Sequence, residues 1–133
     1  MIEITDEALS LEGMMQRARS REAGAVVSFL GTVRDDGIEG MEVEAFLDAA
    51  LAELEAIRQE AMSRFSLAAA EVAHRTGSLA VGEIIVAIVC SAPHRDEAFS
   101  GCRYILEELK SRAPLWKKEI SEKGGNWVEG HGR

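Results

Sequence analysis

Apolar and polar residues alternate along several short stretches of the chain, a pattern typical of β-strands. Residues 24–34 (GAVVSFLGTVR) are rich in Val and Phe and bounded by glycines, which predicts a strand. Residues 83–91 contain IIVAIVC, the most apolar run of the chain, and predict a central, buried strand. Shorter strands are expected at residues 1–4, 41–46, 71–75, 115–120 and 126–128, with turns at residues 35–37, at Gly77 and Gly82, and at residues 123–125.

Other stretches repeat apolar residues at helical spacing and predict two main amphipathic helices. The first, residues 48–64, is expected to bury Leu47, Leu51, Leu54, Ala61 and Phe65. The second, residues 95–112, is expected to bury Ala98, Cys102, Ile105 and Leu109. Pro114 ends the second helix, and a shorter helix capped by Ser10 reaches about Arg19. Because strands and helices mix without a strict βαβ order, the expected fold class is α+β.

The length and composition predict one globular domain over residues 1–133. Hydrophobic residues make up 47% of the chain and charged residues 29%, with two prolines, which disfavours disorder. No apolar run approaches the roughly 20 residues that span a bilayer, and the first residues lack the basic and apolar regions of a signal peptide. Two cysteines without CxxC spacing suit a reducing cytoplasm, and a net charge of −8 disfavours broad binding to nucleic acid or anionic membrane. Any anion site must therefore be local.

Four of the fifteen basic residues nevertheless gather within nine positions. They lie in the stretch LKSRAPLWKKE, residues 109–119, around Pro114 and Trp116. A solvated basic patch does not require Pro-Leu-Trp in its middle, and a core tolerates so many cations only if they are paired or extend to solvent. The combination predicts ordered apolar residues that direct ammonium groups toward an anion, with Trp116 as a packing residue.

Polar groups in two further segments fall where core packing does not require them. Arg34 ends the strand at residues 24–34, and Ser91, His94 and Arg95 lie between the buried strand and the second helix. Taken singly, each has a simpler interpretation. Arg34 can be a solvated strand end and His94 a helix-start residue. The lysines can simply complement the dipole of the helix that they follow. Together they predict a phosphate or carboxylate site, in which the planar guanidinium of Arg can pair with two oxygens of the anion. Neighbouring cations lower the pKa of a lysine, which can then act as a base or nucleophile.

The length of the second helix constrains this site. Arg95 and Lys110 lie fifteen residues apart, which is roughly 22 Å at about 1.5 Å per residue. One small substrate cannot contact both within one chain. Either the two residues serve different sites, or a second protomer brings its His94 and Arg95 to the first protomer's Lys110, as a two-fold dimer would do twice.

Other chemistry has weaker support. His74 has no partner at metal-ligand spacing and is expected to be structural, and the Asp and Glu residues form no recognisable metal-binding loop. The sequence also lacks GxGxxG, Walker and GxSxG motifs, so no metal site and no cofactor is expected. Gly124 and Gly125 are interpreted as a turn. Cys90 and Cys102 fall on apolar faces and are expected to pack in the core, although a reactive Cys90 near His94 remains an alternative.

Five blocks of the sequence resemble the large, catalytic subunit of molybdopterin synthase. They are GAVVSFLGTVR (residues 24–34), HRTGSLAVGE (74–83), SAPHRDEAF (91–99), LKSRAPLWKKE (109–119) and WVE (127–129). The resemblance implies an α/β-hammerhead type of fold with mixed and antiparallel sheets, and a homodimer at the centre of a heterotetramer. Each end of that dimer holds a small ubiquitin-like sulfur-carrier subunit.

The resemblance also implies an activity and a site. The carrier's C-terminal Gly-Gly thiocarboxylate enters a pocket and donates sulfur to cyclic pyranopterin monophosphate (precursor Z), and two transfers build the dithiolene of molybdopterin. Lys110 and Lys117 are the implied catalytic residues. The implied substrate-binding residues are Thr32, Val33, Arg34, His94, Arg95, Lys118 and Glu119. The His-Arg pair would come from the opposite protomer, in agreement with the helix length.

This sequence also departs from the family pattern. A tyrosine-containing strand is usual where this chain has MEVEAFLDAA, residues 41–50, which affects the pocket wall or the carrier contact. His131 stands where the family can supply a basic residue. The leading hypothesis is therefore a sulfurtransferase, with two alternatives: a non-catalytic carrier-binding paralogue, and a persulfide sulfurtransferase that uses Cys90.

Overall fold

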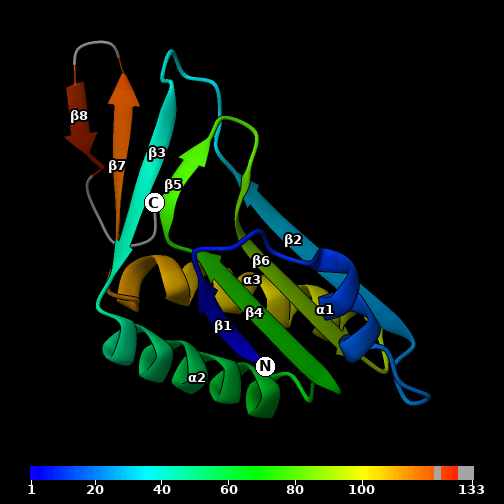
Figure 1. Cartoon of the computed structure of the whole chain (residues 1–133). Helices are drawn as coiled ribbons and strands as arrows, with labels where there is room; N and C mark the ends of the chain where they lie inside the picture. Colours follow the sequence, from blue (N-terminus) through cyan, green and yellow to red (C-terminus); the bar gives the residue numbers. More distant parts are fainter. Residues whose placement is uncertain (122–123, 129–133) are drawn as a thin grey trace.

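The computed structural model describes residues 1–121 and 124–128 and contains two four-stranded sheets with three helices (Figure 1). The helices are α1 (Leu11–Ala18), α2 (Leu47–Arg64) and α3 (Arg95–Arg112). The strands are β1 (Ile2–Thr5), β2 (Ala25–Thr32), β3 (Gly40–Ala45), β4 (Ala69–Arg75), β5 (Gly77–Ala80), β6 (Ile84–Ala92), β7 (Leu115–Ser121) and β8 (Gly124–Trp127). The predicted α+β class is confirmed.

The first sheet has the strand order β1-β4-β6-β2. Its inner strand β6 carries the IIVAIVC run and pairs antiparallel with both β4 and β2, so the prediction of a central, buried strand is confirmed. Helices α2 and α3 pack on one face of this sheet and α1 on the other (Figure 1). Because both faces are covered, β6 is apolar along its length instead of alternating.

Helix α2 buries a different face from the one that its leucines suggest. Its buried residues are Ala50, Leu54, Ile57 and Ala61. Leu47 is 51% exposed and Leu51 is only partly buried, so the expectation for these two was wrong. The buried set repeats with the helical period, and its alanines let the helix backbone approach the sheet closely. The prediction for α2 was wrong because it followed the large leucine side chains instead of the alanines. Helix α3, in contrast, buries the predicted residues together with Gly101.

The second sheet has the order β5-β3-β7-β8 and is antiparallel throughout. Strand β5 was expected to be a connection, because it is short and lies between Gly77 and Gly82. Both glycines have positive φ, +88° and +92°, a conformation that glycine adopts at little cost. The two tight bends leave room for a strand that pairs with β3 and buries its own Leu79.

Gly124 and Gly125 belong to β8 and not to a turn, which corrects the sequence interpretation. Gly124 pairs with Ser121 and Gly125 with Ile120, so β7 and β8 pair as the predicted hairpin requires. A Cβ at Gly125 would collide with the Lys118 side chain, so the glycine provides space for that lysine. Lys123, Glu129 and His131 lie outside the described residues.

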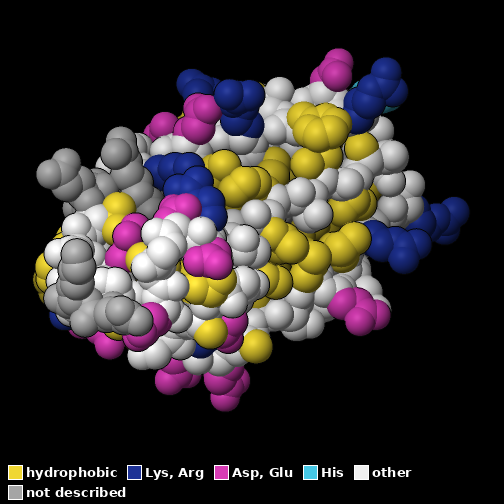
Figure 2. Space-filling view, turned by 90° about the horizontal axis from the view of Figure 1, so that it is seen from above, with side chains coloured by type: hydrophobic (Ala, Val, Ile, Leu, Met, Phe, Trp, Pro, Cys, Tyr) yellow, Lys and Arg dark blue, Asp and Glu magenta, His cyan; other side chains and the backbone are white. Residues whose placement is uncertain are grey.

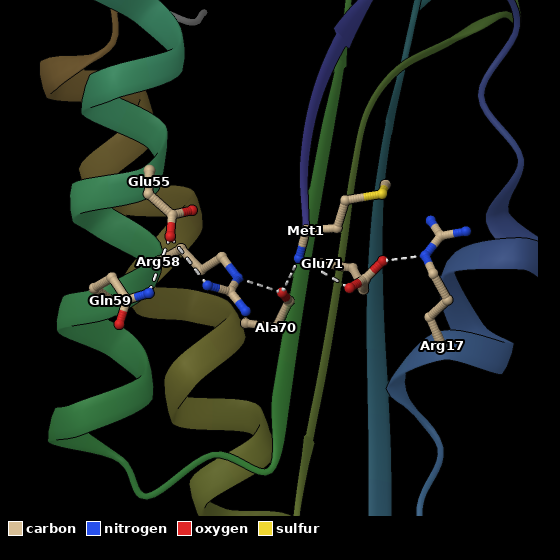
Figure 3. A network of polar contacts seen from close by, with 7 residues as sticks. All are labelled: Met1, Arg17, Glu55, Arg58, Gln59, Ala70 and Glu71. Carbon is tan, nitrogen blue, oxygen red and sulfur yellow. Dashed lines mark hydrogen bonds and ion pairs between the residues drawn. The ribbon is translucent and has the colours of Figure 1, made fainter.

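The amino terminus is anchored by a network around the buried carboxylate of Glu71 on β4 (Figure 3). The terminal ammonium of Met1 lies 3.0 Å from Glu71 Oε2, and Arg17 Nε of α1 lies 2.6 Å from Oε1. Arg58 Nε of α2 donates to the carbonyl of Ala70, as the Met1 ammonium does. These contacts attach β1, α1 and α2 to one strand, since a buried carboxylate is stable only when it is paired.

Candidate functional site

The main candidate site is a cavity of about 460 Å³ where the second sheet meets the first sheet and the carboxyl end of α3. It is lined by Phe29, Gly31, Thr32, Arg34, Asp36, Ile38, Met41, Ile85, Val86, Leu106, Leu109, Lys110, Lys117, Glu119 and Val128. We call this the inter-sheet cavity. Its wall combines apolar side chains with five charged ones, so it can hold a small molecule that carries charge.

Lys117 is the most buried cation of this cavity, with 6% of its surface exposed. It lies on β7 two residues after the buried Leu115, so strand alternation turns it inward. Burial, reinforced by the charge of Lys110, lowers the pKa of Lys117 to about 8. A lysine with this pKa can hold an anion when it is protonated and accept a proton near neutral pH.

The four basic residues of LKSRAPLWKKE point to three different environments. Lys110, exposed at the end of α3, joins Lys117 at the inter-sheet cavity. Arg112 instead ties α3 to α2, because its guanidinium contacts Glu53, Glu60 and Glu108 at 2.6 to 3.0 Å. The Arg112 guanidinium, with the Tyr104 hydroxyl, lowers the pKa of Glu60 to about 2.

Lys118 points to the opposite face of β7 from Lys117. Its ammonium lies 5.5 Å from the ring centroid of Trp127, a cation–π distance, and it does not line the inter-sheet cavity. Trp116 shares that outer face and packs edge-to-face on Phe46, with ring centroids 4.8 Å apart. The predicted packing role of Trp116 therefore has a concrete partner.

The segment after β2 contributes residues of both kinds. Thr32, Arg34 and Glu119 line the cavity, and Arg34 Nε donates to Asp36 Oδ2 at 2.8 Å. Val33, implied to flank the pocket, is only 2% exposed and packs in the core of the second sheet with Val43 and other apolar residues. Asp36 has no counterpart among the sequence-predicted site residues, although the Asp-Asp-Gly turn signal lies at its position.

His94 and Arg95 are not part of the inter-sheet cavity within one chain. Both are exposed at the amino end of α3, and Lys110 lies fifteen residues further along the same helix. The continuous helix preserves the separation of roughly 22 Å that the sequence predicts. A site that contains His94 and Arg95 together with Lys110 therefore requires a second protomer.

A second cavity of about 610 Å³ lies between β2 and α3 and shares Phe29, Leu106 and Lys110 with the inter-sheet cavity. Phe99 of α3, 59% exposed, borders it. Cys102 lines its inner wall. The two cavities meet along one side of α3.

Both cysteines lie in the main core cluster, as predicted. A hydrogen bond with Cys102, together with burial, raises the pKa of Cys90. Cys90 is therefore a poor nucleophile, because the reactive form of cysteine is the thiolate.

Among residues 1–121 and 124–128, no group of three or more His, Cys, Asp or Glu side chains is arranged to hold a metal ion. None of the helices described is long and apolar enough to cross a membrane.

The fold and the site define a class of protein: an α+β protein with two four-stranded sheets, in which a lysine from a helix end and a buried lysine from a strand line one cavity. Comparison with known proteins identifies the family. The MoaE protein family matches residues 4–112. This chain therefore belongs to the MoaE family.

Curated relatives and solved structures agree with this assignment. The molybdopterin synthase catalytic subunit of Pyrococcus abyssi is 41% identical over 128 residues, 93% of this chain and 86% of that protein. That of Caulobacter vibrioides is 44% identical over 117 residues, 84% and 76% of the two chains. Molybdopterin synthase from Staphylococcus aureus superimposes with a TM-score of 0.90 at 35% identity, covering 95% of both chains. The family recognised from the five sequence blocks is confirmed.

Proposed function

We propose that this chain acts as the catalytic subunit of molybdopterin synthase, with the inter-sheet cavity as the place of sulfur transfer. Sulfur would pass from the C-terminal thiocarboxylate of a small ubiquitin-like carrier subunit to precursor Z. The observation that carries the proposal is the pairing of a buried Lys117 with Lys110 at one cavity. Both the thiocarboxylate and the substrate phosphate are anions, and a protein of net charge −8 needs a local cationic site to hold them.

The two lysines would have different roles because their environments differ. Lys110 is exposed at the cavity mouth, where its ammonium can neutralise the incoming carrier terminus. Alternatively, once the carrier's sulfur has bonded to the substrate, the free amine of Lys110 can attack the carrier's carbonyl carbon, so that a C–N bond forms, the C–S bond breaks and the sulfur stays on the substrate. Lys117 is buried, and a charge-assisted hydrogen bond from it to a phosphate oxygen would be strong in that low-dielectric setting. The other charged residues of the lining are Arg34, Asp36 and Glu119, of which Arg34 and Glu119 would orient the substrate.

The proposed active form is a homodimer, with one carrier at each end of a heterotetramer. The helix length supports this, because His94 and Arg95 can reach a Lys110 only if it belongs to the other protomer. The exposed Phe99 at the cavity between β2 and α3 offers an apolar surface for the contact. Figure 2 shows hydrophobic side chains gathered on one face of the molecule, with Lys and Arg side chains beside them.

The chain is proposed to work as one domain in the cytoplasm, in agreement with its two unpaired, buried cysteines. The persulfide alternative has little support, because Cys90 is fully buried and its thiol pKa is raised. No cofactor is assigned to the reaction.

The proposal is tested by incubating the protein with a thiocarboxylated carrier and precursor Z and measuring molybdopterin. Formation of molybdopterin is the expected result. A stable carrier complex without product would instead favour the carrier-binding paralogue. The sequence feature that suggests this alternative is the unusual strand at residues 41–46. Failure to bind the carrier would contradict both.

A further inference from the structure

His74 is a fully buried histidine on β4, and its side chain lies outside the proposed reaction described so far. Burial lowers its pKa to about 4, so the imidazole is neutral near pH 7. Its Nδ1 lies 2.8 Å from the carbonyl oxygen of Arg75. A carbonyl oxygen can only accept, so Nδ1 carries the proton and Nε2 carries the lone pair.

The Nε2 atom has no hydrogen-bond partner within the described part of the chain. A buried acceptor without a donor costs free energy comparable to a lost hydrogen bond, about 1–3 kcal/mol. A buried acceptor without a partner in a native structure calls for an explanation. The Arg75 carbonyl holds the ring in one tautomer, so the lone pair has a defined direction.

Strand register places His74 next to the inter-sheet cavity. His74 pairs with Val86 of β6, and Val86 pairs with Gly31 of β2. Directly opposed residues of neighbouring strands point to the same face, so these three form one row across the sheet. Val86 and Gly31 both line the inter-sheet cavity, and His74 is the next residue of their row, on the neighbouring strand β4.

Lys117 approaches the same row from the second sheet. Its strand neighbour Leu115 packs in one core cluster with Val86, and strand alternation puts Lys117 on the same side as Leu115. The positive charge of Lys117 also disfavours protonation of His74, as expected for two groups close together in a low-dielectric interior. The other charged groups at the cavity are Arg34, Asp36, Lys110 and Glu119.

We propose that His74 is a positioning residue for Lys117: its Nε2 lone pair is the buried acceptor toward which the Lys117 ammonium is drawn, directly or through one water. The ammonium has three donors, so it can use one on His74 and keep others for an anion. The imidazole thus favours the charged form of a lysine that burial disfavours. The inference deepens the proposed function, on which its consequence for catalysis rests.

The experiment compares His74→Gln, which can place an acceptor near the position of Nε2, with His74→Met, which has a similar size and no comparable acceptor. The pKa of Lys117 is measured in each by NMR titration of ¹³C-labelled lysine side chains, assigned with Lys117→Arg. We expect His74→Met to lower the Lys117 pKa by about 1 unit, the size of one charge-assisted contact. His74→Gln is expected to stay closer to the unsubstituted protein.

Equal Lys117 pKa values in the Gln and Met variants would overturn the proposal, because the packing of both resembles that of the histidine. If His74→Met does not fold, the unsubstituted protein decides: ¹⁵N NMR should show His74 protonated at Nδ1, and a proton on Nε2 would exclude the acceptor role. Neither measurement requires turnover. The positioning role of His74 can therefore be disproved while the proposed sulfur transfer stands, and sulfur transfer can be disproved while the positioning role stands.

Discussion

Lys117 of β7 and Lys110 of α3 line the same cavity, although one side chain is buried and the other is exposed. Burial first, and the charge of Lys110 second, lower the pKa of Lys117 to about 8. A lysine in this state is charged at neutral pH but close to losing its proton. Any anion that Lys117 binds at this cavity is therefore expected to bind in a pH-dependent way.

The first prediction concerns that coupling. An anion binds the protonated form of Lys117, so affinity should be constant below pH 8 and fall as pH rises through 8, by up to about tenfold per unit. Isothermal titration calorimetry from pH 6 to 10 with a phosphodiester ligand, whose own charge does not change over this range, measures this. The Lys117→Met variant should bind weakly without the break near pH 8, and a break that persists in it would assign the titration to another group.

The second prediction separates the lysines by position. Lys110→Ala should abolish turnover with the fold intact, and Lys117→Ala should cost about 1.5–3 kcal/mol of binding, roughly 10- to 150-fold. Lys118→Ala is the matched comparison, because Lys118 lies over Trp127 outside the cavity, and its effect should be much smaller. Steady-state kinetics, with circular dichroism as a folding control, measures the loss of activity in each variant. Equal losses in all three variants would contradict the placement of Lys118.

The third prediction is that one site is built from two protomers. Arg95→Ala and Lys110→Ala should each be inactive, whereas their coexpression should restore activity. Each mixed dimer would contain one site of intact residues and one that carries both substitutions. Mass spectrometry must confirm the mixed dimers. Confirmed mixed dimers as inactive as either parent would mean that each chain builds its site alone.

The fourth prediction is that neither cysteine takes part in the reaction. Sulfur that arrives as a thiocarboxylate requires no enzyme thiol, and both cysteines are buried. The Cys90→Ala, Cys102→Ala double variant should keep most activity and lose about 1–3 kcal/mol of unfolding free energy from lost packing. Activity assays and denaturant titrations measure the two effects. Inactivity in a folded double variant would restore the persulfide mechanism.

The fifth prediction follows from the titration of His74. Its pKa is about 4 in the folded protein against 6.5 in an exposed histidine, so the unfolded state binds the extra proton between these values. Stability should therefore fall as pH drops from 6.5 to 4, by up to about 3 kcal/mol. Urea titrations across this range measure the slope. His74→Gln cannot take up this proton and should show a shallower slope; an unchanged slope would assign the acid sensitivity to other groups.

The pattern of residues was sufficient for the elements that bury a regular stripe or a continuous run. β6 and α3 followed directly, because IIVAIVC and the Ala98-Cys102-Ile105-Leu109 spacing each allow one arrangement against a core. For α2 the pattern was ambiguous. Alanines and leucines lie on adjacent sides of that helix, and only close packing against the sheet selects the alanine-bearing side.

The candidate site divides in the same way. The sequence alone determined the clustering of basic residues around Pro114, the separation of Arg95 from Lys110 along one helix, and the family blocks. Only the tertiary structure decided which cations meet: Lys110 and Lys117 line one cavity, Arg112 pairs with carboxylates of α2 and α3, and Lys118 lies on a tryptophan. The reason is that the direction of each side chain depends on the register of its strand or on the contacts of its helix. Both the register and the contacts arise from pairing between residues far apart in the sequence. The same pairing placed His74 beside Val86, which lines the cavity, and the isolated position of His74 in the sequence did not reveal this.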